Sequence, residues 1–315
     1  MSDTQRPDPI QAARPWLPEV VVDADLATAL VRTVAPALAV LPPSPLGAGW
    51  DNTAWVFRDA SDAWVFRFPR RAIAVRCMEA ELAALPALAD HLPLAVPRPQ
   101  WHGAMPNGWP FAGYRLLPGE VLATTPIGTH AQVELAALLG DFVGALHAVP
   151  VALAPGLAPD PLGRLDVDRR EAVTLASLAA SGSPSAAAVP LIAAAREAAT
   201  THATRSVISH GDLDLRHVLV NPATSRVSGV IDWGDLMLAD PAIDLGLAFS
   251  AFDGHARATF LEAYAARTWP VSATTLTLAR FRALTTSARI LTWALDIGDT
   301  ALTHYARAAL GRVLA

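Results

Sequence analysis

The stretch of sequence that decides the fold is residues 210–235, which read HGDLDLRHVLV, NPATSRVSGV and IDWGD. Two short runs rich in β-branched residues flank the turn residues Asn221 and Pro222. This pattern predicts a β-hairpin, with Asp212 before its first strand and Asp232 after its second strand. Because a hairpin brings its two ends together, both carboxylates are expected to face one cleft.

Two carboxylates at this spacing fit the requirements of phosphoryl transfer. One carboxylate must orient an acceptor hydroxyl and take its proton, and another must hold Mg²⁺ against a triphosphate. Asp212 suits the first role, Asp232 suits the second, and His217 is the candidate for a third position at the metal. Since Mg²⁺ prefers oxygen ligands, a hydrogen bond from His217 to a phosphate or to Asp212 is the alternative. His210 is grouped with Asp212 as a catalytic candidate, although a structural bond to the backbone or to Asp232 is favoured over proton transfer.

These motifs resemble a known family. The order His210-x-Asp212, a polar residue five positions after the Asp, and then IDW at 231–233 is similar to the catalytic signature of the aminoglycoside phosphotransferase family. Most members carry Asn at the position of His217, whereas the macrolide phosphotransferase branch carries His there. The segment RHVL at 216–219 therefore most resembles the macrolide branch.

The resemblance implies a bilobal, protein-kinase-like α+β fold. A small N-terminal lobe with a β-sheet is expected over residues 1–113, a hinge over 114–120, and a larger, mainly helical C-terminal lobe over 121–315. The segment DPAIDL at 240–245 also resembles the family, and Asp244 in it is expected to cap a helix or to brace the catalytic loop.

The hydrophobic pattern along the chain agrees with two such lobes. A helix is expected over 24–35, a hairpin over 53–58 and 63–68, and a helix over 72–85 that Pro86 ends or kinks. Further helices are expected over 131–148 and within 255–315, and residues 181–185 read as a connector between helices.

The resemblance also implies a nucleotide site. Arg67 lies where the family places a phosphate-binding Lys, and Glu81 resembles the partner of that cation. The sequence contains no lysine, but Arg keeps its charge and can bind phosphate in a bidentate manner. Glycines near a hairpin are equally compatible with simple turns. The expected nucleotide-binding residues are Gly47, Gly49, Asn52, Arg67, Glu81 and Leu117.

Composition excludes several classes of protein. The 315 residues carry a net charge of −5 without a basic run, which argues against a nucleic-acid partner. A single cysteine, Cys77, excludes an internal disulfide framework. The longest uncharged stretch, 172–195, is interrupted by Gly and Pro, and the N-terminus does not read as a signal peptide. We therefore expect a cytoplasmic protein without a membrane partner.

The expected reaction is transfer of the γ-phosphate of ATP or GTP, with Mg²⁺, to a hydroxyl of a small molecule. A macrolide is favoured over an aminoglycoside antibiotic, and an unknown metabolite stays open as a further alternative. A pocket for polycationic aminoglycosides requires many carboxylates, whereas the regions expected to form the acceptor pocket are largely apolar. Asp214 and Asp235 are expected in a solvated loop, with substrate contact as the alternative. Two other functions stay open. One is a metal-dependent hydrolase that uses His210, Asp212, His217 and Asp232, and the other is a nucleotide-binding module without turnover.

Overall fold

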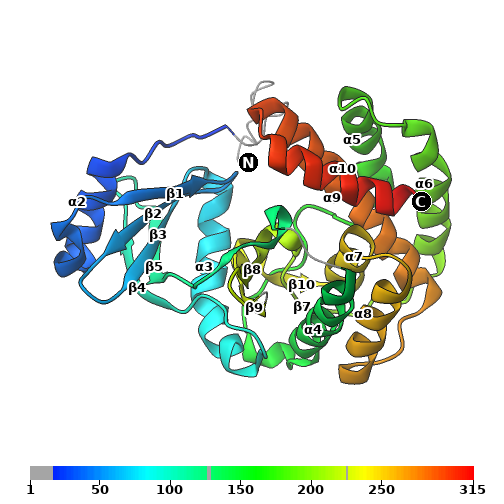
Figure 1. Cartoon of the computed structure of the whole chain (residues 1–315), viewed down its shortest axis with the longest axis horizontal. Helices are drawn as coiled ribbons and strands as arrows, with labels where there is room; N and C mark the ends of the chain where they lie inside the picture. Colours follow the sequence, from blue (N-terminus) through cyan, green and yellow to red (C-terminus); the bar gives the residue numbers. More distant parts are fainter. Residues whose placement is uncertain (1–16, 126–128, 225) are drawn as a thin grey trace, which may run out of the picture. The chain divides into compact units, whose positions relative to one another are not determined.

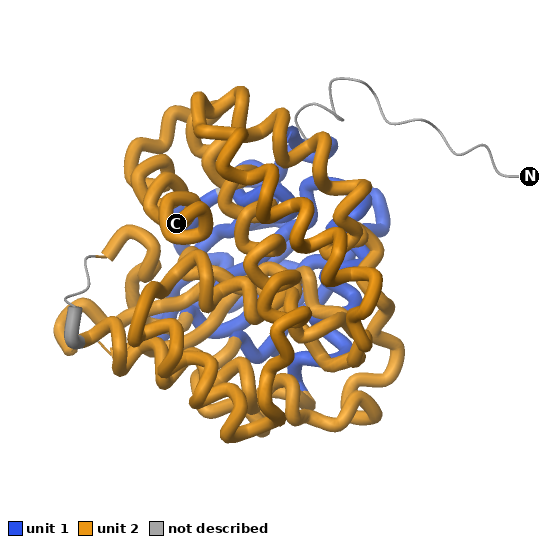
Figure 2. The backbone as a smooth tube through the Cα atoms, turned by 90° about the vertical axis from the view of Figure 1, so that its right-hand side faces the viewer, with its two compact units in different colours: residues 1–86, 97–116 blue, residues 87–96, 117–315 orange. Residues whose placement is uncertain are grey.

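The computed structural model describes residues 17–125, 129–224 and 226–315. The chain forms two compact units, which Figure 2 shows in two colours. The first unit contains residues 1–86 and 97–116, and the second contains residues 87–96 and 117–315. The segment 87–96, which the sequence analysis assigned to the first lobe, belongs to the second unit. The backbone N–H of Val230 in that unit donates to the carbonyl of Ala95 at 2.9 Å.

The first unit is a five-stranded antiparallel sheet in the order β1-β2-β3-β5-β4. The predicted hairpin is present as β2 and β3, with Trp55 opposite Phe66. The elements of this part of the chain are α2 (Ala24–Val34), η1 (Pro36–Val40), β1 (Ser44–Ala48), β2 (Asn52–Arg58), β3 (Ala63–Pro69), α3 (Ala72–Leu88), β4 (Pro99–Ala104) and β5 (Pro110–Arg115) (Figure 1).

Alternation of side chains along β3 places the hydrophobic core of the first unit on one face of the sheet and Arg67 on the other. Phe66 and Phe68 point to the face that packs on α2, where they join Val31 and Phe111 in one buried cluster. Side chains of a strand alternate between faces, so Arg67 lies on the opposite face. The sheet thus buries its aromatic residues against α2 and presents Arg67 on the side from which Glu81 of α3 reaches it.

The second unit is mainly helical and carries two small sheets, in the orders β6-β8-β9 and β10-β7. Helices α4 and α8 pack along each other, and α9 lies against α7 and α10. Its elements are η2 (Ala89–His91), β6 (Glu120–Val121), η3 (Leu122–Thr124), α4 (Thr129–Ala148), η4 (Val151–Leu153), α5 (Val167–Ala180), α6 (Ser185–Thr201), β7 (Val207–Ser209), η5 (Leu215–His217), β8 (Val218–Asn221), β9 (Arg226–Val230), η6 (Trp233–Asp235), β10 (Met237–Ala239), α7 (Ala242–Ala251), α8 (Gly254–Arg267), α9 (Ala273–Ile297) and α10 (Thr300–Leu314).

The helix ends follow local chemistry. Asp23 caps α2, because its Oδ1 accepts the N–H of Leu26 at 2.9 Å. The helix predicted over 72–85 continues to Leu88, with Pro86 inside its last turn. The helix continues for two residues beyond Pro86, so Pro86 does not end it. Among the described residues, none of the helices combines the length and apolar character that a membrane crossing requires.

Candidate active site

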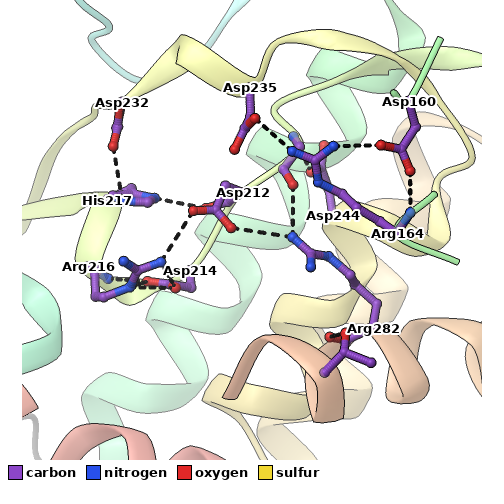
Figure 3. A network of polar contacts seen from close by, with 12 residues as sticks. Asp160, Arg164, Asp212, Asp214, Arg216, His217, Asp232, Asp235, Asp244 and Arg282 are labelled. Atoms are coloured by element: carbon purple, nitrogen blue, oxygen red, sulfur yellow. Dashed lines mark hydrogen bonds and ion pairs between the residues drawn. The ribbon is translucent and has the colours of Figure 1, made fainter. Parts of the chain in front are cut away.

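The predicted hairpin of the second unit is formed by β8 and β9, and it brings the two candidate carboxylates together. Val218 pairs with Val230, and the N–H of Ile231 donates to the carbonyl of His217 at 2.8 Å. Asp212 precedes this paired region and Asp232 follows it. Figure 3 shows both side chains on the two sides of the His217 ring.

His217 connects the two aspartates. Its Nδ1 lies 2.8 Å from the backbone carbonyl oxygen of Asp212, and its Nε2 lies 3.4 Å from Oδ2 of Asp232. A carbonyl only accepts hydrogen bonds, so Nδ1 must carry a proton. In a neutral ring, Nε2 then directs a lone pair at a carboxylate, an arrangement that becomes favourable when a proton or a metal cation lies between the two atoms. The hydrogen bond to Asp212 considered for this histidine is thus present, but it is made to the backbone.

Asp232 has an unusual backbone conformation. Its φ and ψ are 63° and 64°, and it is the single non-glycine residue with positive φ in the described part of the chain. Asp tolerates this left-handed region better than most residues, because its short side chain can bond locally. Its side chain is 48% exposed, which leaves oxygen atoms accessible to a ligand. Such conformations recur at functional sites, where surrounding structure maintains them.

Two arginines hold the carboxylate of Asp212. Arg216 Nη2 lies 3.3 Å from Oδ2, and Arg282 Nη2 lies 3.3 Å from Oδ1. Burial acts to raise the pKa of Asp212, but Arg216, with His217, Arg282 and Arg164, outweighs it and holds the pKa well below its usual range. The side chain is still 30% exposed. Asp212 is therefore an accessible carboxylate that remains ionised.

The structure corrects the expectation of a solvated loop for Asp214, whereas Asp235 has an arginine partner but keeps a side chain that is 31% exposed. Asp214 is buried, caps η5 through the N–H of Arg216 at 2.6 Å, and pairs with the Arg216 guanidinium. Asp235 lies 2.6 Å from Arg164 Nη2. Asp214 thus has its arginine partner from a tight local turn, and Asp235 has its partner through tertiary folding.

Asp244 braces the catalytic loop, one of the two roles expected for it. Its Oδ2 accepts the N–H of His210 at 2.8 Å and its Oδ1 accepts the N–H of Gly211 at 2.9 Å. Oδ2 also lies 3.1 Å from Nε2 of His147, whose Nδ1 lies 3.1 Å from the hydroxyl of Tyr264. Burial raises the pKa of Tyr264 to about 12, so its hydroxyl stays protonated and donates to His147. This chain of bonds ties the residues before Asp212 to α4, α7 and α8.

His210 is positioned as a structural residue. It is completely buried, and its Nε2 donates to the carbonyl of Ile231 at 3.0 Å. Burial lowers its pKa, so the ring is neutral. Its Nδ1 has no hydrogen-bond partner among the described residues. The bond to Ile231 fixes the residue before Asp232, and a role in proton transfer would require access that the ring does not have.

Loss of the Asp244 carboxylate should destabilise the protein. Asp244→Asn removes one charge and at least one buried acceptor, and we expect it to lower the free energy of unfolding by about 3 kcal/mol. Equilibrium urea unfolding measures this change. The Asp168→Asn variant, which alters an aspartate 83% exposed on α5, should change stability by less than about 0.5 kcal/mol.

The same variant should alter the acid sensitivity of the fold. Burial acts to raise the pKa of Asp244, but His147 and the Gly211 N–H hold it below its usual range. In the unfolded chain the carboxyl has a pKa of about 3.9 and takes up its proton first as the pH falls. Its stabilisation is therefore present above about pH 4 and lost below it. Asp244→Asn should show a shallower fall in stability between about pH 5 and 3, and an unchanged slope would contradict this account.

In the first unit, Arg67 and Glu81 form the ion pair that the resemblance implied. Arg67 Nη1 lies 3.0 Å from Oε1 and 2.9 Å from Oε2 of Glu81, and both residues are buried. A buried guanidinium with this partner keeps its charge at a fixed place on the sheet.

The remaining candidates of the first unit lie in the turn between β1 and β2. Gly49 donates its N–H to the Asn52 carbonyl at 3.0 Å, and its own carbonyl accepts from Arg70 Nη1 at 2.7 Å. The side-chain oxygen of Asn52 is buried and lacks a hydrogen-bond partner among the described residues. A Cβ on Gly47 would meet no atom within 4 Å, so its backbone is open on that side. Leu117 lies in the second unit. Its side chain lies so near Gly229 that a Cβ on this glycine would be 3.0 Å from Leu117 Cδ1.

Mg²⁺ fits the residues of the second unit better than zinc does. Within the described ranges, His, Cys, Asp and Glu side chains nowhere gather in a group of three that could hold a metal ion. Mg²⁺ commonly uses one or two carboxylates together with substrate phosphates and water, so it does not need such a group. The accessible carboxylate of Asp232, faced by the Nε2 lone pair of His217, is the fitting position for this cation.

The fold and these residues together define a kinase-like phosphotransferase that acts on small molecules. The model of the phosphotransferase enzyme family matches residues 43–274, and the chain belongs to this family. The resemblance seen in the sequence is thereby confirmed. A curated relative, aminoglycoside 3'-phosphotransferase of Streptomyces fradiae, is 44% identical over 61 residues, which cover 19% of this chain and 23% of the relative.

Solved structures share the fold over nearly the whole chain. APH(2")-IIIa, solved with GDP and kanamycin, is similar with a TM-score of 0.69 and 22% identity, over 91% of this chain and 97% of that one. Macrolide 2'-phosphotransferase MphH of Brachybacterium faecium is similar with a TM-score of 0.58 and 26% identity, over 85% and 91% of the two chains. The bilobal, kinase-like α+β class expected from the sequence is therefore confirmed.

Proposed function

We propose that this protein transfers the γ-phosphate of ATP or GTP to a hydroxyl of a small molecule, with Asp212 as the residue that orients the hydroxyl and accepts its proton. One observation carries the proposal. A single imidazole, His217, bonds the backbone of Asp212 through one nitrogen and faces the carboxylate of Asp232 through the other. The positions of the base and of the metal ligand are thus fixed relative to each other.

Asp232 and His217 are the residues that would hold Mg²⁺, which when bound neutralises charge on the triphosphate. What the chain itself supplies is orientation. Asp244 fixes the backbone before Asp212, and Arg216 and Arg282 keep the Asp212 carboxylate ionised. An ionised carboxylate of low pKa is a weak base, so it acts mainly by aligning the hydroxyl and receives the proton late in the reaction.

The first unit is proposed to bind the nucleotide. Arg67, held by Glu81, would contact its phosphates, and the backbone of the turn at Gly47, Gly49 and Asn52 would cover them. Leu117 would border the base at the hinge over 114–120. The support is the buried ion pair and the relatives solved as complexes with GDP or ADP.

An antibiotic is the acceptor class that the relatives suggest, and a macrolide or an aminoglycoside is the expectation from the sequence. The alternatives are less well supported. A metal-dependent hydrolase would need His210 at the ion, but His210 is buried and bonds the backbone. A binding module without turnover is not favoured, because Asp212 and Asp232 are both present and accessible.

A phosphoryl-transfer screen tests this proposal. The whole chain is incubated with Mg²⁺ and ATP or GTP labelled in the γ-phosphate, together with macrolides, aminoglycosides and small hydroxyl metabolites, and labelled products are separated from the nucleotide. Acceptor-dependent product and protection of the fold against heat by nucleotide with Mg²⁺ would support it. Tight zinc binding without any nucleotide effect would favour the hydrolase, and nucleotide binding without transfer would favour the inactive module.

A further inference from the structure

A buried arginine links the segment after Asp232 to a loop that precedes α5. The side chain of Arg164 in this loop is 4% exposed. Its Nη1 lies 2.6 Å from Oδ1 of Asp160, and its Nη2 lies 2.6 Å from Oδ1 of Asp235. Figure 3 shows the guanidinium of Arg164 between these two carboxylates. We call the three residues Asp160, Arg164 and Asp235 the arginine bridge.

The loop that carries Arg164 is fixed by bonds of its own. Asp160 accepts the N–H of Leu162 at 3.0 Å and also the N–H of Arg164 itself. The N–H of Leu238 in β10 donates to the carbonyl of Ala158 at 2.9 Å, which attaches the loop to a strand. Arg164 therefore extends from a support whose position does not depend on its contact with η6.

The other end of the bridge holds the turn that begins at Asp232. Asp235 is the last residue of η6, and the N–H of Leu236 after it donates to the carbonyl of Trp233 at 3.1 Å. Trp233 is buried. The carbonyl oxygen of Asp235 lies so close to Gly211 that a Cβ on this glycine would collide with it. The turn after Asp232 is thus packed against the catalytic loop.

The left-handed backbone of Asp232 requires restraint on both of its sides. A residue with φ of 63° and ψ of 64° is held there by its surroundings, because the conformation is unfavourable for an isolated residue. On the preceding side, Ile231 makes the backbone bonds to His210 and His217 described above. On the following side, the arginine bridge ties η6 to another part of the chain. The bridge therefore supplies restraint where the bonds of Ile231 do not reach.

A second carboxylate on one guanidinium points to a geometric role for the bridge. Burial acts to lower the pKa of Arg164, but Asp235, with Asp160, outweighs burial and raises it, so the arginine stays charged. Asp160 alone could compensate this single charge at 2.6 Å. The side chain of Asp235 is 31% exposed, so water could solvate it without an arginine. The contact between Arg164 and Asp235 is therefore required by neither charge, and what it changes is the place of η6.

We propose that Asp235 is a positioning residue for Asp232. Held by Arg164, it keeps η6 in place and thereby maintains the backbone conformation in which the Asp232 carboxylate faces Nε2 of His217. The inference rests on the proposed function, because it concerns the side of the same site that would hold Mg²⁺. Asp235 itself is assigned no contact with the cation, the nucleotide or the acceptor, and it acts through the turn that it shares with Asp232.

Mg²⁺-dependent binding of ADP tests the positioning role without turnover. Titration calorimetry of the whole chain with ADP over a series of Mg²⁺ concentrations gives the apparent Mg²⁺ affinity. Asp235→Ala should weaken this affinity about tenfold, the usual effect of losing a group that orients a metal ligand, and leave the ADP affinity in a chelator unchanged. Asp235→Asn should fall between Asp235→Ala and the wild type, because its amide oxygen can still accept from Arg164.

Asp166→Ala is the matched control. Asp166 lies two residues after Arg164 and caps α5 through the N–H of Arg169 at 3.0 Å, outside the bridge. Its loss should lower the stability to urea, as the loss of Asp235 also does, but keep the apparent Mg²⁺ affinity within about twofold of the wild type. A general effect of reduced stability is thereby separated from displacement of Asp232.

Hydrogen exchange of the Leu236 amide, followed by NMR without nucleotide or metal, is the second readout. This N–H bonds the carbonyl of Trp233 within η6, so release of the turn should speed its exchange about tenfold in Asp235→Ala and leave it unchanged in Asp166→Ala. The measurement reports the restraint on η6 directly, whatever binds at the site.

Two results would overturn the positioning role: an apparent Mg²⁺ affinity of wild-type size in Asp235→Ala, or an equal loss of that affinity in Asp166→Ala. The proposed function fails in a different way, namely when the ADP affinity of the wild-type protein does not respond to Mg²⁺ at all. Faster exchange of Leu236 in Asp235→Ala would then still support the restraint of η6 by the bridge, whereas unchanged exchange would refute that restraint as well.

Discussion

Asp212→Asn is expected to lower the rate of phosphoryl transfer by about a thousandfold and to leave nucleotide affinity within about twofold of the wild type. The amide has nearly the same shape, but Arg216 and Arg282 contact different oxygens of the carboxylate, so only one of them keeps an oxygen acceptor in the variant. It cannot receive the proton of the acceptor, and it no longer attracts the hydroxyl as a charged group. The loss should therefore appear in kcat, measured in single turnovers with the best acceptor of the screen.

The low pKa of Asp212 adds a second expectation to this experiment. Arg216, His217, Arg282 and Arg164 keep the carboxylate ionised against the effect of burial, so it is still charged at pH 5. Any loss of wild-type activity toward pH 5 must then come from another group. Asp168→Asn is the control for altered surface charge and should keep the wild-type rate. An Asp212→Asn rate within threefold of the wild type would remove Asp212 from the role of base.

Asp232→Asn is expected to abolish the Mg²⁺ dependence of nucleotide binding. A neutral amide oxygen is a poorer ligand for this hard cation than a carboxylate, so nucleotide affinity in Mg²⁺ should fall at least about tenfold, to the value measured with a chelator. Titration calorimetry with and without Mg²⁺ measures both affinities. A Mg²⁺ effect of wild-type size in the variant would place the metal elsewhere.

The choice of Asn at position 232 follows from the backbone. With φ at 63°, the position accepts Asn nearly as well as Asp, whereas Ala has to adopt a left-handed conformation at a cost of about 1–2 kcal/mol. Asp232→Ala should therefore unfold at a lower temperature than Asp232→Asn, although both lack the carboxylate. Comparing the two variants separates loss of the ligand from loss of stability.

The parts of the site that the sequence predicted are those close together along the chain. Asp212, His217 and Asp232 fall within one hairpin, whose turn residues and β-branched strands are visible in the sequence. Arg67 and Glu81 are fourteen residues apart on a strand and the following helix, and the family resemblance implied their pairing. The proximity of Asp212, His217 and Asp232 could be predicted with little knowledge of tertiary packing.

The arginines around Asp212 could not be placed in the same way. Arg282 lies seventy residues beyond Asp212, and its position depends on how α9 packs against α7. Arg282 is buried, and a buried guanidinium requires an acidic or carbonyl partner, which here comes from a distant part of the chain.

The arginine at position 67, in a chain without lysine, has a consequence for chemical labelling. Acylating nucleotide probes react with the amine of a phosphate-binding lysine, and these 315 residues offer no side-chain amine. A dicarbonyl reagent such as phenylglyoxal, which condenses with guanidinium groups, would have to reach a side chain that is buried and held by both oxygens of Glu81. The exposed arginines of the protein, Arg196 and Arg267 among them, should be modified long before Arg67.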